Sequence, residues 1–348
     1  MFRILDNFEG GNIRLIKIDG DCVHLENDLR DNVSDWFYWA FCIENAAGRT
    51  LQFVFDDADR RVGPWGAAMS TDLKNWQWTE GRSAQGEGFT CTIPSDRVYL
   101  AHNMLYTTKQ FQNFAAEIGL EEEVLTQSRK KRNVPVYRFG TGHRNILLTA
   151  RSHACEGTGS YALEGAVRAL IAHPFQNMSL TIVPFVDYDG VVDGDQGKCR
   201  APFDHNRDYR ADAIYPECRS LIRMVPYASF DFHSPNHSGG RSDGSYLVYS
   251  HTAKEENIQS LAKIFQKTAK YCELKYHPEN DVFPNTAFNR PDSTNCNNWF
   301  GEHSLLRMSL TLETSYFGQA GEVFTEKRAM DLGRAFGEAI QIWMDQCV

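Results

Sequence analysis

Strand-like and helical patterns alternate along the last two thirds of the chain, and this order limits the fold more than any other feature. Alternation of this kind is typical of a mostly parallel or mixed sheet that is covered by helices. We therefore expect an α/β domain here. The predicted strands span residues 146–150, 180–186, 228–233 and 308–313, and the predicted helices span residues 160–172, 254–271 and 325–345.

The first hundred residues have a different character. They are rich in aromatic and β-branched residues, and turn signals interrupt them at 9–12, 19–21 and 56–59. This pattern predicts short antiparallel strands packed as a sandwich. A chain of 348 residues with 42% hydrophobic content can form two packed cores. We expect an N-terminal β-sandwich domain over residues 1–105 and a second domain over residues 106–348.

Composition narrows the cellular setting. The amino terminus lacks the apolar run of a secretory signal, and no segment is apolar over the length needed to span a bilayer. Nine cysteines, an odd number without paired spacing, favour a reducing compartment, so we expect a cytoplasmic protein. The net charge of −9 argues against nucleic acid as a partner for the basic run at 129–132.

The turn between the first strand and the first helix of the second domain carries candidate metal ligands. His153 and Glu156 lie three residues apart there, so both side chains can reach one metal ion. A catalytic zinc site typically uses two His and one Glu and keeps a fourth position open. The motif is short, and taken alone it is more simply explained by an acidic residue at a helix N-terminus beside a hydrogen-bonded His.

Three later segments favour the metal interpretation. Residues 197–209 contain Arg200, Asn206 and Arg207, which suit a site that holds a carboxylate and polarises a carbonyl, although a polar surface loop is the alternative. The strand at 228–232 leads directly into His233, at the strand end where open α/β sheets place their sites. A further strand ends on Glu313, which would otherwise cap the following turn.

In this order the segments resemble the zinc carboxypeptidases of the funnelin (M14) family, most closely the cytosolic carboxypeptidase branch. The resemblance implies a zinc-carboxypeptidase-like mixed sheet flanked by helices, preceded by an antiparallel β-sandwich domain. It covers nearly the whole chain, since residues 35–39, 70–76 and 99–106 look like the amino-terminal domain of that branch. The matching catalytic motifs are Arg-x-His-x-x-Glu at 151–156, Arg200 followed by Asp-x-Asn-Arg at 204–207, Asp-x-His at 231–233 and Thr-Leu-Glu-x-Ser at 311–315.

The resemblance also implies residue roles. His153, Glu156 and His233 would bind one zinc ion, and Glu313 would act as general base on the zinc-bound water and then as general acid to the leaving amine. Arg200 would polarise the scissile carbonyl. The substrate's terminal carboxylate would be received by Asn206 and Arg207.

The chain departs from the branch in two places. Ala154 and Cys155 stand where the branch has Pro-Gly, and we interpret Cys155 as a packing residue rather than a ligand. From residue 277 to residue 312 there is no tyrosine to fill an accessory role known from the digestive relatives. In the same region Arg290 would either form a basic pocket for acidic side chains or lie exposed on a loop.

We therefore expect a metallocarboxypeptidase that uses a peptide or protein C-terminus as substrate, with acidic terminal residues as one candidate class, and that needs no membrane or nucleic acid. The oligomeric state stays open. One alternative is a related zinc amidohydrolase acting on N-acyl amino acids or cell-wall peptides. Another is a catalytically silent protein that binds a peptide or glycan through the aromatic residues of the first domain, namely Trp36, Trp39, Trp65, Trp76 and Trp78.

Overall fold

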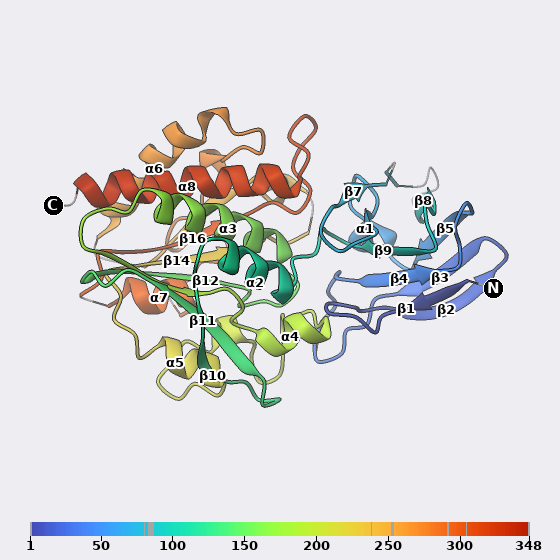
Figure 1. The fold of residues 1–348 in the computed structure, drawn as a ribbon, viewed down its shortest axis with the longest axis horizontal. Coiled ribbons are helices and arrows are strands. Elements are labelled where there is room, and N and C mark those ends of the chain that lie inside the picture. The colour runs from blue at the N-terminus through green and yellow to red at the C-terminus, as the bar shows by residue number, and fades with distance from the viewer. Residues whose placement is uncertain are drawn as a thin grey trace.

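The computed structural model describes residues 2–79, 81–82, 87–237, 239–251, 254–290, 292–303 and 305–346. The strands of the amino-terminal hundred residues form two sheets on one side of the molecule, and a larger sheet covered by helices lies beside them (Figure 1). Within the described residues, no helix is both long enough and apolar enough to cross a membrane.

The two amino-terminal sheets have the strand orders β1-β4-β9-β6-β7 and β2-β3-β5-β8. Their strands pair antiparallel, as expected, except that β3 and β5 are parallel. Buried aromatic rings fill the space between the sheets, with Trp39, Phe41, Phe53 and Phe89 at its centre. The elements are β1 (Arg3–Leu5), β2 (Arg14–Asp19), β3 (Cys22–Glu26), β4 (Ala40–Glu44), β5 (Thr50–Phe55), α1 (Ala58–Arg61), β6 (Ala68–Ser70), β7 (Gln77–Trp78), β8 (Gly88–Thr92) and β9 (Arg97–Ala101).

The larger sheet has the order β10-β11-β13-β12-β14-β16-β15. Its central strands β13, β12, β14 and β16 are parallel, their outer neighbours β11 and β15 run antiparallel to them, and the edge strand β10 runs antiparallel to β11. This mixed sheet confirms the predicted fold class. Its strands are β10 (Glu122–Gln127), β11 (Asn133–Phe139), β12 (Arg144–Ala150), β13 (Met178–Val183), β14 (Ala228–His233), β15 (Tyr246–Tyr249) and β16 (Met308–Glu313).

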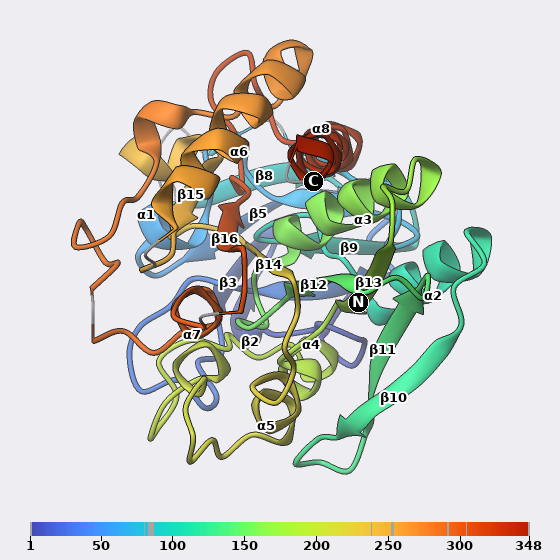
Figure 2. The ribbon, with the colours of Figure 1, turned by 90° about the vertical axis from the view of Figure 1, so that its left-hand side faces the viewer.

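Helices cover both faces of this sheet, so the central strands are buried on both sides. Helices α3, α6 and α8 lie over one face, and α4, α5 and α7 lie over the other (Figure 2). The helices are α2 (Thr108–Glu117), α3 (Gly157–Ala172), α4 (Tyr188–Asp193), α5 (Pro216–Leu221), α6 (Glu255–Thr268), α7 (Cys296–Gly301) and α8 (Glu326–Gln346), with short 3-10 turns η1 (His205–Arg207), η2 (Gly240–Asp243), η3 (Ala269–Tyr271) and η4 (Pro278–Asn280).

Helices α3 and α8 approach each other so closely that glycine is required at their contact. A Cβ atom added to Gly165 would lie 1.9 Å from the Met330 carbonyl oxygen, and one added to Gly333 would lie 2.0 Å from that of Ala162. Real Cβ atoms do not approach backbone atoms this closely. The two backbones are therefore in direct contact, and this pairing supports the helix that begins at the candidate metal site.

The amino-terminal sheets are joined to the larger domain by specific polar contacts. The Gln196 side chain accepts a hydrogen bond from the Tyr38 backbone N–H at 2.9 Å and donates to the Tyr38 carbonyl at 2.8 Å. The Trp65 indole donates to the Phe317 carbonyl at 2.9 Å, and the Trp78 indole donates to the Phe324 carbonyl at 2.8 Å. These bonds hold the first domain against the rim of the larger sheet.

Candidate metal centre

The three proposed ligands come from the ends of neighbouring parallel strands. β12 ends at Ala150, and the chain then turns through His153 and Glu156 into α3. Arg151 begins this turn with a left-handed backbone (φ 59°), and its guanidinium donates to the carbonyls of Ala154 and Tyr106. His233 is the last residue of β14, which pairs directly with β12.

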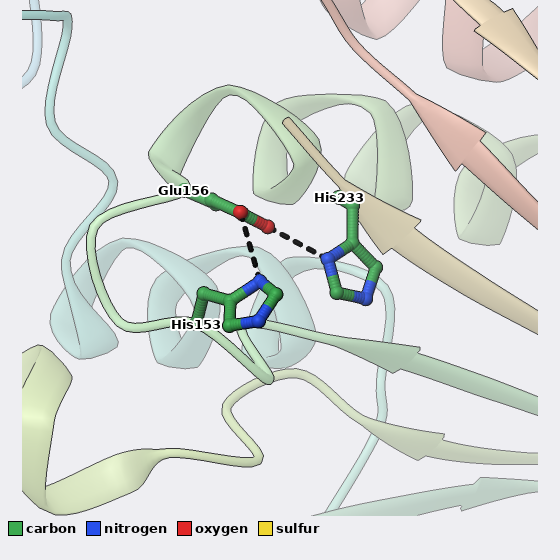
Figure 3. A group of neighbouring side chains, drawn as sticks. All are labelled: His153, Glu156 and His233. Atoms are coloured by element: carbon green, nitrogen blue, oxygen red, sulfur yellow. Dashed lines mark hydrogen bonds and ion pairs between the residues drawn. The ribbon is translucent and has the colours of Figure 1, made fainter. Parts of the chain in front are cut away.

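The structure brings these three side chains together (Figure 3). His153 Nδ1 lies 2.8 Å from Glu156 Oε1, and His233 Nδ1 lies 2.7 Å from Glu156 Oε2. One potential ligand atom from each residue falls within 4.8 Å of the others. All three side chains are buried. Both imidazoles thus present the same nitrogen toward one carboxylate.

The surroundings of the two imidazoles fit a zinc site. His233 Nε2 lies 2.7 Å from Asp231 Oδ2, and the other oxygen of Asp231 accepts a hydrogen bond from Thr149 Oγ1 at 2.6 Å. His153 Nε2 lies 3.7 Å from Asp204 Oδ1. Zinc-binding His residues commonly donate their second ring N–H to a carboxylate, which leaves the first nitrogen free to bind metal. Two imidazoles and one carboxylate are also a donor set that zinc prefers.

The electrostatics of the ligands reflect a buried acid among cations. Burial alone would raise the pKa of Glu156, but His153, Lys198 and His233 hold it well below its ordinary value. Burial lowers the pKa of His153 to about 4, so this imidazole is neutral at pH 7. Glu156 is therefore ionised, which is the form a metal ion needs.

Glu313 lies beside the ligands without being one of them. It is the last residue of β16 and stands in register with His233 on β14. Its side chain is buried, and among the described residues Oε2 has no hydrogen-bond partner. Burial raises its pKa to about 7, and the negative charge of Glu156 acts in the same direction. This carboxyl group is suited to take up and release a proton near neutral pH.

These residues line one cavity of about 550 Å³. His233 and Glu313 line it from strand ends, His153 lines it from the turn after β12, and Asn206 and Arg207 line it from η1. The Asp204 side chain accepts a hydrogen bond from the Arg207 backbone N–H at 3.2 Å and so fixes this loop. Of the seven residues singled out in the sequence analysis, five thus line this cavity, and a sixth, Glu156, contacts His153 beside it.

Arg200 is the exception, because the structure places its side chain elsewhere. It is not among the residues that line the cavity. Its guanidinium forms ion pairs with Asp31 and Asp187, and a further one with Asp195 at 3.1 Å. These carboxylates line a separate hollow of about 270 Å³ together with Arg200. In this structure the Arg200 guanidinium therefore faces three carboxylates and not the cavity that holds the candidate ligands.

The cavity also contains residues that sequence reasoning missed. Lys198 lines it, and its ammonium lies 2.8 Å from Glu156 Oε1 and 5.2 Å from the centre of the Trp36 ring. Trp36 comes from the first domain and forms part of the same wall. Arg241 also lines the cavity, whereas Arg290 is exposed and does not line it. The only sequence signal for Lys198 was its position beside the Arg200 segment.

Comparison with known proteins agrees with this geometry. Residues 4–102 match the model of the cytosolic carboxypeptidase N-terminal domain. The metallo-carboxypeptidase from Burkholderia cenocepacia superposes with a TM-score of 0.83 at 19% identity and covers 100% of both chains. The chain has the metallo-carboxypeptidase fold. The family model supports the resemblance of residues 4–102 to the cytosolic carboxypeptidases, and the superposition confirms the expected fold over the whole chain.

Two further relatives complete the comparison. The metallo-carboxypeptidase from Pseudomonas aeruginosa, solved in complex with (2-guanidinoethylmercapto)succinic acid, has a TM-score of 0.81 at 16% identity over 99% of this chain and 100% of that one. An uncharacterized protein of Zymomonas mobilis is 30% identical over 174 residues, which are 47% of this chain. That match spans less than half, 46%, of the relative's own length.

Proposed function

We propose that the protein is a zinc-dependent metallocarboxypeptidase that removes the C-terminal amino acid from a peptide or protein. One observation carries the proposal: the cavity beside the His153, Glu156 and His233 cluster also holds Arg207 and the buried carboxyl of Glu313, whose Oε2 has no hydrogen-bond partner among the described residues. A metal-ligand set, a proton-transfer group and a carboxylate-binding cation are the parts that this hydrolysis needs.

We propose that His153, Glu156 and His233 hold one zinc ion. When bound, zinc would act as a Lewis acid toward the scissile carbonyl and would lower the pKa of water to about 7. The carboxylates near the Nε2 atoms, Asp231 beside His233 and Asp204 beside His153, would keep both imidazoles in the orientation seen here.

Arg207 and Asn206 are proposed to receive the substrate's terminal carboxylate. A guanidinium grips a carboxylate through two parallel hydrogen bonds, which fixes both position and direction. Asn206 Oδ1 is buried and has no partner among the described residues, so this side chain is free to orient its amide toward a ligand. Binding at this point would place the last peptide bond of the substrate near Glu313.

Glu313 is proposed to carry the proton. It takes one proton from the attacking water as the new C–O bond forms, and it delivers that proton to the leaving amine as the C–N bond breaks. The second water proton stays on the new carboxyl group and then passes to the released amine, so the products are a shortened chain with a new carboxylate and a free amino acid with a protonated amine. A group with a pKa near 7 suits both halves of this cycle, because neither protonation state is strongly favoured.

An acidic terminal residue is the substrate class that we propose, with Arg241 as the partner of its side chain. Arg241 lines the cavity, and no described residue forms an ion pair with it. We expect Arg241→Met to lower kcat/KM about tenfold for peptides ending in Glu and to leave those ending in Leu nearly unchanged. Arg290→Met, on the exposed loop, is the matched control. Equal losses for both peptide classes would remove Arg241 from specificity.

Three of the tryptophans that motivated the alternative of a silent binding protein are engaged within the structure. Trp39 is fully buried between the first two sheets, and Trp65 and Trp78 bond to the larger domain. We retain residue 105 as the proposed domain boundary and the cytoplasm as the proposed location. The amidohydrolase alternative would use the same ligands and base, so only substrates separate it from a carboxypeptidase.

The decisive experiment combines metal analysis with substrate profiling. Purified protein is assayed for zinc content and then incubated with a C-terminally randomised peptide library and with a panel of N-acyl amino acids. We expect one zinc per chain and release of single amino acids from peptide C-termini, both abolished by a chelator and restored by zinc. Turnover of N-acyl amino acids alone would favour the amidohydrolase, and a zinc-loaded protein that cleaves neither class would contradict the proposal.

A further inference from the structure

The proposed hydrolysis needs a positive charge at the carbonyl oxygen, and Arg200 does not line the cavity in which that oxygen would lie. As the carbonyl carbon is attacked, its π electron pair moves onto oxygen, and a cation aimed there contributes a few kcal/mol. Among the residues lining the cavity, the lysine and arginine residues are Lys198, Arg207 and Arg241, and the two histidines are the proposed metal ligands. Arg207 is assigned to the terminal carboxylate and Arg241 to the side chain, so Lys198 remains.

The backbone is built to bring Lys198 to the ligand loop. Gly197 has a left-handed backbone (φ 72°), and a Cβ atom there would lie 2.2 Å from the Ala154 nitrogen. The Cys155 N–H donates to the Gln196 carbonyl at 3.3 Å. The chain just before Lys198 is thus packed directly against the turn that carries His153 and Glu156. A side chain larger than hydrogen at position 197 would push the two segments apart.

The ammonium of Lys198 is held between Glu156 and Trp36. Its nitrogen lies 2.8 Å from Glu156 Oε1 and above the Trp36 ring, and its side chain is 19% exposed. An ammonium carries three N–H donors in a compact head. One donor can remain on Glu156 while another points into the cavity toward a substrate oxygen. The Trp36 face stabilises the cation and limits the directions in which it can move.

We propose that Lys198, not Arg200, is the catalytic cation that stabilises the oxyanion during cleavage. The inference rests on the proposed function. In the step concerned, the water oxygen bonds to the carbonyl carbon, Glu313 takes the water proton, and the negative charge that forms on the carbonyl oxygen lies against the Lys198 ammonium. When the C–N bond breaks, the electron pair returns to the carbonyl and the proton goes to the amine. Lys198 neither gains nor loses a proton overall.

The test compares Lys198→Met with two other variants. Lys198→Arg keeps the charge in a different shape. Lys130→Met is the matched control, because Lys130 also pairs with a carboxylate, Asp193 at 2.7 Å, but does not line the cavity. Each protein is measured for zinc content, for kcat and KM on an N-acylated dipeptide ending in Glu, and for calorimetric affinity toward the phosphonate analogue of that dipeptide. The free product amino acid serves as the reference ligand.

We expect Lys198→Met to lower kcat by 10²–10³-fold with KM and zinc content nearly unchanged. Its affinity for the phosphonate, which imitates the tetrahedral oxyanion, should fall by a similar factor, whereas its affinity for the product amino acid should not change. Lys198→Arg should recover part of both losses, and Lys130→Met should match the wild type.

Three outcomes would overturn the inference. A loss of activity that follows a loss of zinc would make Lys198 a support for Glu156 and not an oxyanion group. Turnover within threefold of wild type would exclude it from the step altogether. If the zinc-loaded wild type cleaves no peptide, the proposed function itself fails and this inference with it. If the wild type is active and Lys198→Met has the same kcat, only the role of Lys198 is overturned.

Discussion

Glu313 is the residue whose surroundings most directly predict a chemical effect. It stands in register with a proposed zinc ligand, His233, but belongs to a different strand and makes no ion pair in the described structure. Replacing its carboxyl with an amide keeps the shape and removes the proton-transfer group. The metal and the base should therefore be separable by mutation.

We expect Glu313→Gln to bind one zinc ion per chain and to lose 10²–10⁴-fold in kcat, because a positioned general base contributes about this factor. Zinc content by atomic absorption and steady-state kinetics measure the two effects. His233→Gln is the opposing control, since it should lose the metal together with the activity. A zinc-loaded Glu313→Gln protein with near wild-type turnover would exclude Glu313 from the mechanism.

The residue scale also shows where sequence reasoning reached its limit. The positions of His153, Glu156, His233 and Glu313 could be predicted because they end strands, or follow a strand in the next turn, and the carboxyl ends of those strands meet at one edge of a sheet. The choice between Lys198 and Arg200 could not. Both lie in one loop, and which cation enters the cavity depends on the left-handed turn at Gly197 and on carboxylates contributed from elsewhere, including Asp31 of the first domain.

At the scale of elements, the long periodic segments were predicted closely. The strands at 228–233 and 308–313 have the predicted bounds, and the final helix, predicted at 325–345, is Glu326–Gln346. The parallel pairing of β3 with β5 was not foreseen, because alternation within a strand shows which face is buried but not which neighbour it pairs with. The exposed β2 carries no alternation at all.

The contact between α3 and α8 gives a prediction at this scale. We expect Gly333→Ala to destabilise the protein by about 1–3 kcal/mol, because overpacking a tight contact costs this much. The change would otherwise be favourable, since alanine is the better helix former by about 1 kcal/mol. Denaturant unfolding measures the effect, with the exposed Lys327→Ala on the same helix as control. A more stable Gly333→Ala protein would show that the helices can separate without loss.

At the scale of the whole molecule, the interface between the two domains buries a pair of imidazoles. His102 follows β9, and His237 lies in the loop after β14, with ring centres 5.1 Å apart and Phe37 against both. Burial lowers the pKa of His237 to about 3, and the charges of nearby arginines act in the same direction. The pKa of His102 is also well below its ordinary value, mainly because the side chain is buried and, to a smaller extent, because His237 lies beside it.

This pair makes the interface sensitive to acid. In the unfolded chain each His has a pKa near 6.5, so between about pH 3 and pH 6.5 the unfolded state binds more protons than the folded state. Stability is fully present above pH 6.5 and is lost as the pH falls. For His237 the loss at pH 5 is about 2 kcal/mol relative to neutral pH.

Denaturant unfolding of the wild type and of His237→Gln at pH 7 and pH 5 tests this expectation. The variant should be less stable at pH 7 but should lose about 2 kcal/mol less between the two pH values, because its amide does not titrate. A fluorescence probe of the Trp residues at the interface would follow the same transition. An identical pH dependence in both proteins would contradict the assignment.

Trp36 belongs to the first domain and yet forms a wall of the cavity in which the proposed chemistry takes place. The first hundred residues therefore cannot be exchanged for another domain without changing the cavity. A protein that begins at residue 106 would have a cavity open on one side, because it would lack the Trp36 indole beside the Lys198 ammonium. Fusion partners and domain swaps at this junction should be judged as active-site mutations.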